Sequence, residues 1–554
     1  MNNRKMKALF LGIAALVMMF SAGCSNNSSS TSPTSNDTKG DEQAAEAPIG
    51  KYDSPIELTS AVVSADPWNT LPDGDTAESN AFTRAYLDEL GIKANIVWSV
   101  SGDKRDEKIN LEIASDALPD VIMVNRMQFE QLAAAGQLED LTGLIEKYGN
   151  DTMKELYGPD NKVAVDAFTV DGKLLGIPWN VDHTETSHML YVRADWLKKL
   201  NLPEPKTIAD LTAIAKAFMT QDVDGTGHHA DYGIAMNKDL AATGLFNSFH
   251  AYPGIFVKDD ASGKLVNGAY VPGMRTAVEQ IKAWYESGII AKDFGAKDHT
   301  AMLEDLNSGK VGIHFGGIWE AWGGLQQGKD RDPKVDWKAY PLPSVDGNPA
   351  KVGIQPLLVN GVFVVKKGYD HPEALVKMFN LYVEKLLGTP EELSAFGYDN
   401  EKGYQPYAYA LGIAEPMLRK NYQIYASVKE ALETNDASKL TSEQKINYDA
   451  IVKYRNGDNS QWFVELCYGP NGTLSLLEYY DQNKLYQLDA YTGVPTTSMI
   501  AKGPTISKLW NEMLTKVFMG GDMADYDAFI KKVDSLGNAD IEKEVNDFYN
   551  KHNK

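Results

Sequence analysis

The chain has 554 residues, 43% of them hydrophobic, which is enough for a large core divided among about two or three domains. Its 76 Asp and Glu residues outnumber its 54 Lys and Arg residues and give a formal net charge of −22. A chain this acidic is a poor candidate for binding nucleic acid or an anionic membrane surface, and we expect no nucleic-acid partner.

The first 23 residues have the features of an export signal. Basic residues between positions 4 and 7 precede an apolar run from Ala8 to Phe20, and small residues follow it. The run is shorter than the roughly 20 residues of a permanent membrane-spanning helix. Residues 1–23 are therefore predicted to be a signal peptide, with Cys24 directly after the cut.

The cysteine at the cut resembles the lipobox of bacterial lipoproteins, although Ser21 stands where Leu is usual. The resemblance implies that Cys24 becomes the mature N-terminus and carries acyl chains such as palmitate. Two or more chains would hold the protein stably on the outer face of the cell membrane. An ordinary signal peptide with an incidental cysteine is the alternative. The other cysteine, Cys467, is expected to be a small buried hydrophobic residue.

Residues 24–50 are expected to form a flexible linker, because they are rich in Ser, Asn and Thr and nearly free of large apolar side chains. Predicted strands and helices then alternate up to Val124. We expect strands over Ile56–Val63, Ala94–Trp98 and Asp120–Val124, and helices over Asn80–Leu90 and Lys104–Ile113. This order predicts a parallel sheet with helices on both faces, and ligands of such sheets bind at the carboxyl ends of the strands.

The rest of the chain contains both kinds of element. We expect strands over 172–180, Met189–Arg193, Lys310–Phe315 and Gly361–Val365, an extended run over Val335–Leu342, and helices over Asp195–Leu200, Thr207–Met219, Met274–Ser287, His299–Asn307, Pro372–Val383, Ser507–Met519, Asp525–Leu536 and Ile541–His552. Residues 390–490 are rich in Tyr and are expected to be irregular.

Several blocks of sequence resemble extracellular solute-binding proteins of family 1, the sugar-capturing lipoproteins of ABC importers. The blocks are Leu174–Trp179, Tyr191–Leu197, Gly309–Trp319, Gly493–Met499 and Asp525–Tyr549. The last two resemble the large Gram-positive oligosaccharide-binding members, and the similarity covers most of 50–554. It implies a two-lobed α/β fold of the type II periplasmic-binding-protein kind, with parallel or mixed sheets flanked by helices and a hinge between the lobes.

The resemblance also implies a division of the chain and a way of working. An N-terminal lobe would cover 51–188, with 358–386 returning to it, and a C-terminal lobe would cover 189–345 with most of 387–554. A sugar or oligosaccharide would bind between the lobes, which would close on it by hinge motion. The closed protein, a monomer, would deliver the ligand to the membrane subunits of an ABC permease without catalysis.

A sugar site needs exposed aromatic faces and planar hydrogen-bonding side chains. Trp68, Trp179 and Trp319 each follow the end of a predicted strand and are our aromatic candidates, with Trp322, Trp462 and Tyr468 behind them. The polar candidates beside them are Asp66, Asn69, Asn180, Asp182, His183 and Glu185. The alternative for any Trp is core packing, which we predict for Trp196, Trp284 and Trp510.

The segment Asp222–Asp231 matches the start of a calcium-binding loop. Asp222, Asp224 and Thr226 supply oxygens at positions 1, 3 and 5, and the turn at Gly227 lets His228 offer its carbonyl. Ala230 and Gly233 occupy positions 9 and 12, so the loop is not a standard EF-hand. It resembles the shorter loop of alginate-binding family members, which closes with an acid at position 10, where Asp231 stands. This predicts a structural Ca²⁺ ion; a solvated Asx-turn is the alternative.

Two other functions stay open at this point. A surface-anchored glycoside hydrolase would need two facing carboxylates, and Asp182 and Glu185 are formal candidates. An adhesive surface lipoprotein would bind no small ligand. The acidity of the chain argues against uronide ligands, although Lys104, Arg105 and Arg193 could form a local basic pocket.

Overall fold

The computed structural model describes residues 47–63, 70–157, 165–180, 183–240, 243–322, 324–355, 359–399, 402–413 and 419–552. The predicted signal peptide, Cys24 and almost all of the predicted linker lie outside these ranges. All described residues belong to one compact unit, Ala44–Lys554. Within these ranges, none of the helices combines the length and the apolar character needed to cross a membrane.

The first sheet has five strands in the order β2-β1-β3-β13-β6. Its strands are β1 (Ile56–Val63), β2 (Ile92–Val100), β3 (Val121–Val124), β6 (Ile177–Asn180) and β13 (Val359–Val365). Strand β1 pairs in parallel with β2 and β3, whereas β13 is antiparallel to both β3 and β6. The sheet is therefore mixed, and the four strands other than β13 all end at the same edge. The α/β fold class predicted from the sequence is confirmed.

The predicted strand over 172–180 is divided in two. Lys173–Leu174 (β5) forms a small hairpin with Thr169–Val170 (β4), and only β6 enters the large sheet. Gly176 separates the two pieces, and a Cβ there would lie 2.6 Å from Val362 of the neighbouring strand. The Val362 side chain thus leaves no room for a Cβ at this position, which requires glycine.

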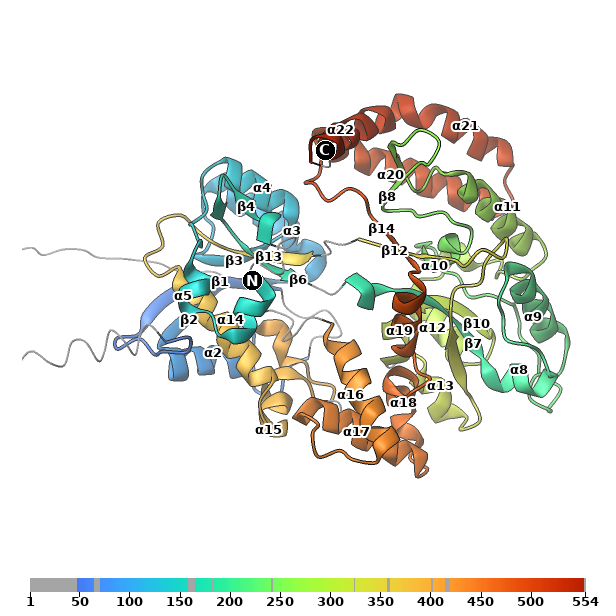
Figure 1. Ribbon diagram of the computed structural model, residues 1–554, viewed down its shortest axis with the longest axis horizontal. Helices are drawn as coiled ribbons and strands as arrows, with labels where there is room; N and C mark the ends of the chain where they lie inside the picture. Colours follow the sequence, from blue (N-terminus) through green and yellow to red (C-terminus); the bar gives the residue numbers. More distant parts are fainter. Residues whose placement is uncertain are drawn as a thin grey trace, which may run out of the picture. The chain divides into compact units, whose positions relative to one another are not determined.

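Helices pack on this sheet around a core that includes Leu58, Phe82 and Phe379. They are α2 (Ala81–Ala85) with its π-helical continuation η1 (Tyr86–Leu90), α3 (Gly102–Ser115), α4 (Arg126–Ala134), α5 (Leu144–Tyr148), α6 (Asp151–Tyr157) and α14 (Glu373–Leu386). Helix α14 returns from far along the chain to lie beside α2, where the rings of Phe82 and Tyr382 stack 5.7 Å apart (Figure 1). The core also takes in Leu411 and Ile413.

A second hydrophobic core surrounds a three-stranded antiparallel sheet in the order β10-β7-β11. Its strands are β7 (His188–Arg193), β10 (Ile313–Gly317) and β11 (Trp337–Tyr340). Its helices include α8 (Ala194–Leu200), α9 (Ile208–Thr220), α11 (Pro272–Glu286), α12 (His299–Asn307), α20 (Thr497–Phe518), α21 (Met523–Val533) and α22 (Ala539–His552). The predicted core positions Trp196, Trp284 and Trp510 are confirmed, since each is at most 9% exposed.

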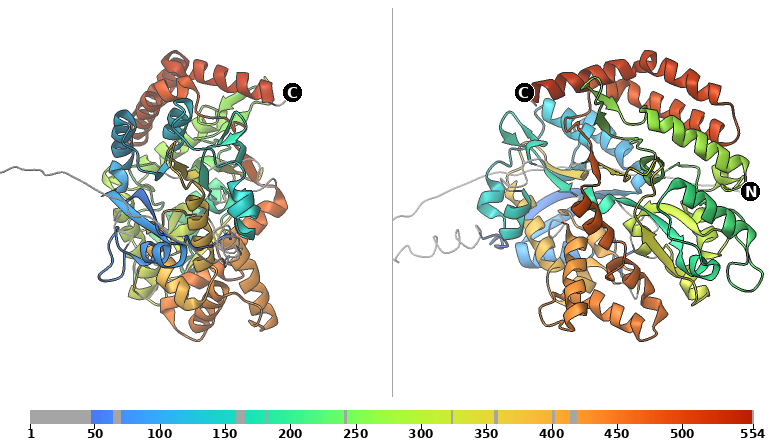
Figure 2. Two further views of the ribbon diagram at one scale, coloured as in Figure 1. Left: turned by 90° about the vertical axis from the view of Figure 1, so that its left-hand side faces the viewer. Right: turned by 45° about the vertical axis from the view of Figure 1, so that its right-hand side comes forward.

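The prediction that residues 390–490 are irregular is wrong. The structure has helices α16 (Lys420–Thr434), α17 (Ser442–Arg455), α18 (Trp462–Tyr468) and α19 (Ser475–Asn483) there. Tyr residues act as the apolar positions of these helices, as Tyr425 and Tyr480 do in the core, so the helical period is hidden when Tyr is counted as polar. Figure 2 shows α16 and α17 as a packed pair of helices in orange.

Candidate functional site

Trp179 stands at the edge where four strands of the first sheet end. Because β6 runs in the same direction as β1, β2 and β3, its last residues meet theirs, as expected for a ligand site of an α/β sheet. A cavity of about 210 Å³ opens there. Its lining includes Ser60–Val63 from β1, Trp98 from β2, Met123 from β3, Trp179 from β6 and Arg105 from α3.

Three hydrogen-bonding groups at this edge are buried without partners among the described residues. They are the indole N–H groups of Trp98 and Trp179 and the hydroxyl of Ser99. An unsatisfied buried donor costs about 1–3 kcal/mol, so such groups usually mark a place for water or a ligand. Both Trp98 and Trp179 line the cavity of about 210 Å³.

Trp179 also borders a larger cavity of about 350 Å³, which is within the usual size range of small-molecule sites. The first core and residues packed against it contribute Tyr382, Leu386, Leu393, Tyr398 and Tyr407, and the same stretch of chain adds Gly397 and Gln405. Helices α16, α17 and α18 contribute Lys420, Asn421, Glu443, Asn447, Phe463 and Tyr468. The cavity thus combines aromatic faces with amide, hydroxyl and carboxylate groups.

The carboxylate of Glu443 is the centre of one polar group in this cavity. It accepts a hydrogen bond from the Tyr398 hydroxyl at 3.1 Å and pairs with the ammonium of Lys420 at 2.8 Å. Burial and the adjacent carboxylate raise the pKa of Tyr398, which keeps the phenol protonated as a donor. The Lys420 and Glu443 side chains are only 14% and 10% exposed.

Glu185, which the sequence offered as a ligand contact, binds other parts of the chain in the structure. It lies in the short helix η3 (His183–Thr186) between β6 and β7, and it is buried. Its carboxylate accepts from the Asn421 amide and from the Tyr422 backbone N–H, both at 2.7 Å. Tyr468 donates to the other side of the Asn421 amide at 2.9 Å. Glu185 thus links the segment between β6 and β7 to the start of α16 by hydrogen bonds. It does not line the two cavities beside Trp179.

Trp319 lies at the end of β10, in the helix η5 (Ile318–Trp322), and is 43% exposed. Its ring covers Gly317, where a Cβ would come within 2.3 Å of the ring atoms. The His188 ring packs against it in a T-shaped arrangement, with the ring centroids 5.7 Å apart. One part of the indole is therefore held against the protein and another is open, which suits stacking on a sugar ring.

A cluster of histidines lies beneath Trp319. His314 is buried and His188 is partly buried, and Nε2 of His314 lies 3.7 Å from the Glu320 carboxylate. Burial lowers the pKa of His188 to about 4, so this imidazole is neutral at neutral pH. Burial by itself raises the pKa of Glu320, but the histidines around it outweigh this effect and the pKa lies below its ordinary value.

Several sequence candidates lie outside the described residues. They are Asp66, Trp68, Asn69 and Asp182, together with the side chains of Asn180, His183 and Trp322. Of the other aromatic candidates, Trp462 is buried at 2% exposure and Tyr468 lines the larger cavity. Sequence reasoning missed Lys420, Glu443 and Phe463, which only helical spacing within 420–468 would have indicated.

The loop Asp222–Asp231 forms the turns that a calcium loop needs, with Gly225 and Gly227 at φ values of 90° and 88°. One Asp222 oxygen accepts from the Gly225 N–H at 2.7 Å, and one Asp224 oxygen accepts from the Thr226 N–H at 2.8 Å. The His228 carbonyl accepts from the Val223 N–H at 2.8 Å. In the described part of the chain, no three His, Cys, Asp or Glu side chains are grouped as a metal site. The loop has the turns and the oxygen ligands that a calcium site needs. In this structure, however, these oxygens accept hydrogen bonds from backbone N–H groups of the loop itself.

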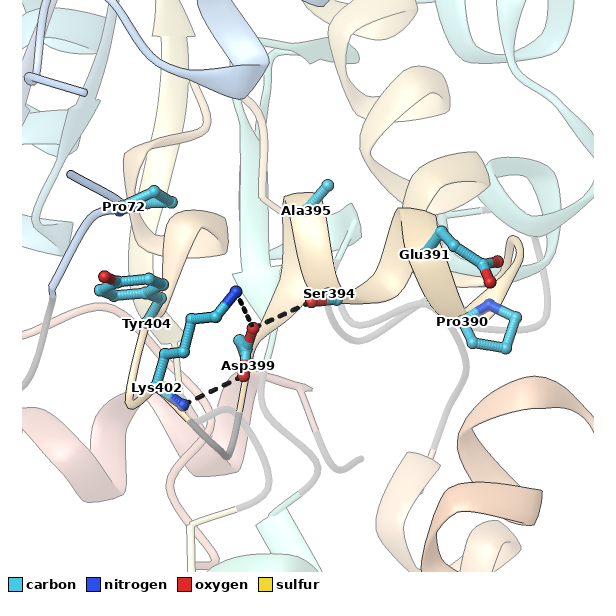
Figure 3. Close-up of a pocket in the computed structure, with 8 residues that line it drawn as sticks. All are labelled: Pro72, Pro390, Glu391, Ser394, Ala395, Asp399, Lys402 and Tyr404. Atoms are coloured by element: carbon cyan, nitrogen blue, oxygen red, sulfur yellow. Dashed lines mark hydrogen bonds and ion pairs between the residues drawn. The ribbon is translucent and has the colours of Figure 1, made fainter. Parts of the chain in front are cut away.

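A further hollow of about 470 Å³ lies on the surface near Pro72 and Pro390. Figure 3 shows Asp399 between Ser394 and Lys402, which bind its carboxylate at 3.2 Å through the Ser394 hydroxyl and at 3.1 Å through the Lys402 backbone N–H. Because these partners occupy the carboxylate, this hollow offers little to a ligand, and we do not include it in the candidate site.

Comparison with known proteins gives a consistent picture. Residues 80–380 match the family model of bacterial extracellular solute-binding proteins. The polygalacturonan/rhamnogalacturonan-binding protein YtcQ of Bacillus subtilis is 26% identical over 53% of this chain and 56% of its own length. The fructooligosaccharide ABC transporter substrate-binding protein FusA of Streptococcus pneumoniae is 29% identical over 41% of this chain and 44% of its own length. The chain thus spans about half the length of these curated relatives.

The fold is also found among solved structures. An HMO-binding, ABC-transporter-associated solute-binding protein from Bifidobacterium longum infantis superposes with a TM-score of 0.62. It is 17% identical, and the alignment covers 90% of this chain and 99% of that one. The resemblance read from the sequence is confirmed at the level of the fold and of the extracellular solute-binding family.

Proposed function

Because the chain belongs to the family of bacterial extracellular solute-binding proteins, we propose that it captures an oligosaccharide at Trp179 and delivers it to the membrane subunits of an ABC importer. The observation that carries this proposal is the position of Trp179. Its half-buried indole borders two cavities at the carboxyl edge of the first sheet, and its N–H has no partner among the described residues. An aromatic face with an unpaired donor is what a sugar ring with its hydroxyls requires.

We propose that the two hydrophobic cores are the cores of two lobes that close on the ligand. The first lobe would contain 51–188 and 358–386, extended to 413 by Leu411 and Ile413, and the second would contain 189–345 with most of the chain after 419. The larger cavity supports this division, since its lining comes from the first core and from helices packed with the second. A monomer in the closed form would be what the permease recognises.

The test is the melting temperature of the purified protein with a panel of oligosaccharides. A ligand at about 100 times its dissociation constant should stabilise the protein by about 2.7 kcal/mol. A rise with one class of sugar, without release of reducing sugar, supports the proposal. Release of reducing sugar would support a hydrolase instead, and no rise with any sugar would overturn the proposal.

We also propose that the loop Asp222–Asp231 binds a structural Ca²⁺ ion through Asp222, Asp224, Thr226, the His228 carbonyl and Asp231. Calcium should then raise the melting temperature, and a chelator should lower it, because binding to the folded state alone stabilises that state. An Asp222→Asn, Asp224→Asn double variant should no longer respond. A melting temperature that is the same with calcium and with chelator would contradict this site.

Lipid attachment at Cys24 is our proposal for how the exported protein stays at the cell surface. Its support is the apolar run and the small residues that precede Cys24. Cells fed an alkyne-tagged fatty acid should label the unsubstituted chain, and Cys24→Ala should take no label. Equal labelling of both chains, or of neither, would refute acylation at this residue.

A further inference from the structure

The charges around Trp179 decide what class of saccharide the site can accept, a question that the family leaves open. In the larger cavity the charged lining residues are Lys420 and Glu443, and in the smaller cavity the charged lining residue is Arg105. A site for uronic acids needs a cation that is available to the sugar carboxylate. The question is therefore whether an acidic side chain already neutralises each of these cations.

Lys420 is neutralised inside the cavity. Its ammonium lies 2.8 Å from the Glu443 carboxylate, and both side chains are almost fully buried. A uronate placed beside Lys420 would also lie beside Glu443, where little water screens the repulsion between two carboxylates. The pair therefore presents no net positive charge to a ligand.

The other basic candidates lie outside the larger cavity, so they do not change the balance of charge there. Arg105 lines only the smaller cavity, and its Nε lies 3.2 Å from the carboxylate of Asp106. Arg193 forms two hydrogen bonds to Asp195 at 2.8 and 2.6 Å and stacks 4.3 Å above Trp196, away from both cavities. Lys104 lines neither cavity. The undescribed segments 64–69 and 181–182, which follow β1 and β6 in sequence, each contain one Asp and no Lys or Arg.

The uncharged groups suit neutral hydroxyls. Trp179 offers an N–H donor, and the Gln405 amide can both donate and accept. The Asn447 amide donates to the Glu443 carbonyl at 2.9 Å and keeps its oxygen as an acceptor for a hydroxyl. Phe463 and the Tyr side chains of the lining add apolar faces for the C–H groups of a sugar ring. We propose that the site selects a neutral oligosaccharide and rejects uronic-acid oligomers through the Lys420–Glu443 pair. This inference rests on the proposed function.

The experiment compares, by calorimetric titration of the purified protein, neutral fructo-, malto-, galacto- and xylo-oligosaccharides with oligogalacturonates of matched length. We expect binding to at least one neutral series and at least about tenfold weaker binding of every oligogalacturonate, because like charges in contact are strongly unfavourable. The neutral affinity should be the same at low and high salt, since no ligand charge is involved.

The variant Glu443→Gln removes the repelling carboxylate and leaves Lys420 unbalanced. At low salt, the ratio of the oligogalacturonate dissociation constant to the neutral-sugar dissociation constant should fall by about tenfold. Glu465→Gln is the matched control, because it also removes one partner of an ion pair, to Arg455 at 2.8 Å, but lines neither cavity. The control should keep the selectivity of the unsubstituted protein.

The outcomes separate the two claims. Tighter binding of an oligogalacturonate than of every neutral sugar would overturn the inference and leave the proposed oligosaccharide function standing. Binding of no sugar at all would overturn the function and the inference with it. If Glu443→Gln does not fold, the selectivity and the salt dependence of the unsubstituted protein still decide the question.

Discussion

Replacement of Trp179 by alanine is expected to weaken oligosaccharide binding by at least about 30-fold, because truncation of an aromatic anchor in a binding site costs about 2 kcal/mol or more. The indole lines both cavities, so its loss removes the aromatic face that they share and one of the unpaired donors. Trp179→Phe keeps an aromatic ring and removes the N–H. Its dissociation constant should lie between those of the unsubstituted protein and Trp179→Ala. Titration calorimetry measures all three proteins.

The control for this prediction is Trp510→Ala. Trp510 packs against Tyr270 and Phe529 in the second core and lines neither cavity. Its replacement should lower the melting temperature and leave the dissociation constant unchanged. If Trp179→Ala binds the sugar as tightly as the unsubstituted protein does, the ligand does not use this site.

The stability of the protein is expected to fall steeply between about pH 6.5 and pH 4, in part because of His188. Burial lowers the pKa of this imidazole from 6.5 to about 4, so in this window the unfolded chain binds a proton that the folded chain excludes. The contribution is fully present above pH 6.5 and is lost as the pH falls, and the loss reaches about 3 kcal/mol at pH 4.

His188→Asn should reduce this fall, as measured by urea unfolding at pH 7.5 and at pH 4.5. The comparison is made between variants because Asp489, whose pKa burial raises to about 6, acts in the opposite direction in every one of them. His371→Asn, on the surface beside Glu373, controls for the loss of a histidine. An unchanged difference between the two pH values in His188→Asn would show that this side chain is hydrated or paired in solution.

Much of the fold follows from local patterns in the sequence. The strand predicted over Ile56–Val63 has the same bounds in the structure, and the helices over Thr207–Met219 and His299–Asn307 agree to within a residue at each end. Alternating and helical apolar periods decide such elements within a few residues of chain. The antiparallel insertion of β13 between β3 and β6 could not be predicted in this way, because Val362 pairs with Val124 and with Pro178, which precede it by 238 and 184 residues.

The residues of the candidate site likewise fall into those that local sequence indicates and those that only tertiary packing brings together. The sequence made Trp179 and Trp319 candidates because it predicts strand ends beside them, at Pro178 and at the glycine pair before Trp319, although Trp179 lies inside β6 in the structure. Glu443 and Lys420 were missed because the Tyr-rich region around them was taken for irregular chain, although it forms helices α16 and α17. Only the packing of these helices brings Glu443 to Tyr398 at 3.1 Å, and nothing local to either residue indicates that contact.

A crystal structure of the protein with the oligosaccharide that stabilises it most would test binding at Trp179 most directly. We expect a sugar ring against the Trp179 indole, with the sugar hydroxyls reaching the indole N–H and the amides of the larger cavity. A ligand bound elsewhere, with both cavities beside Trp179 left to solvent, would contradict binding at this tryptophan.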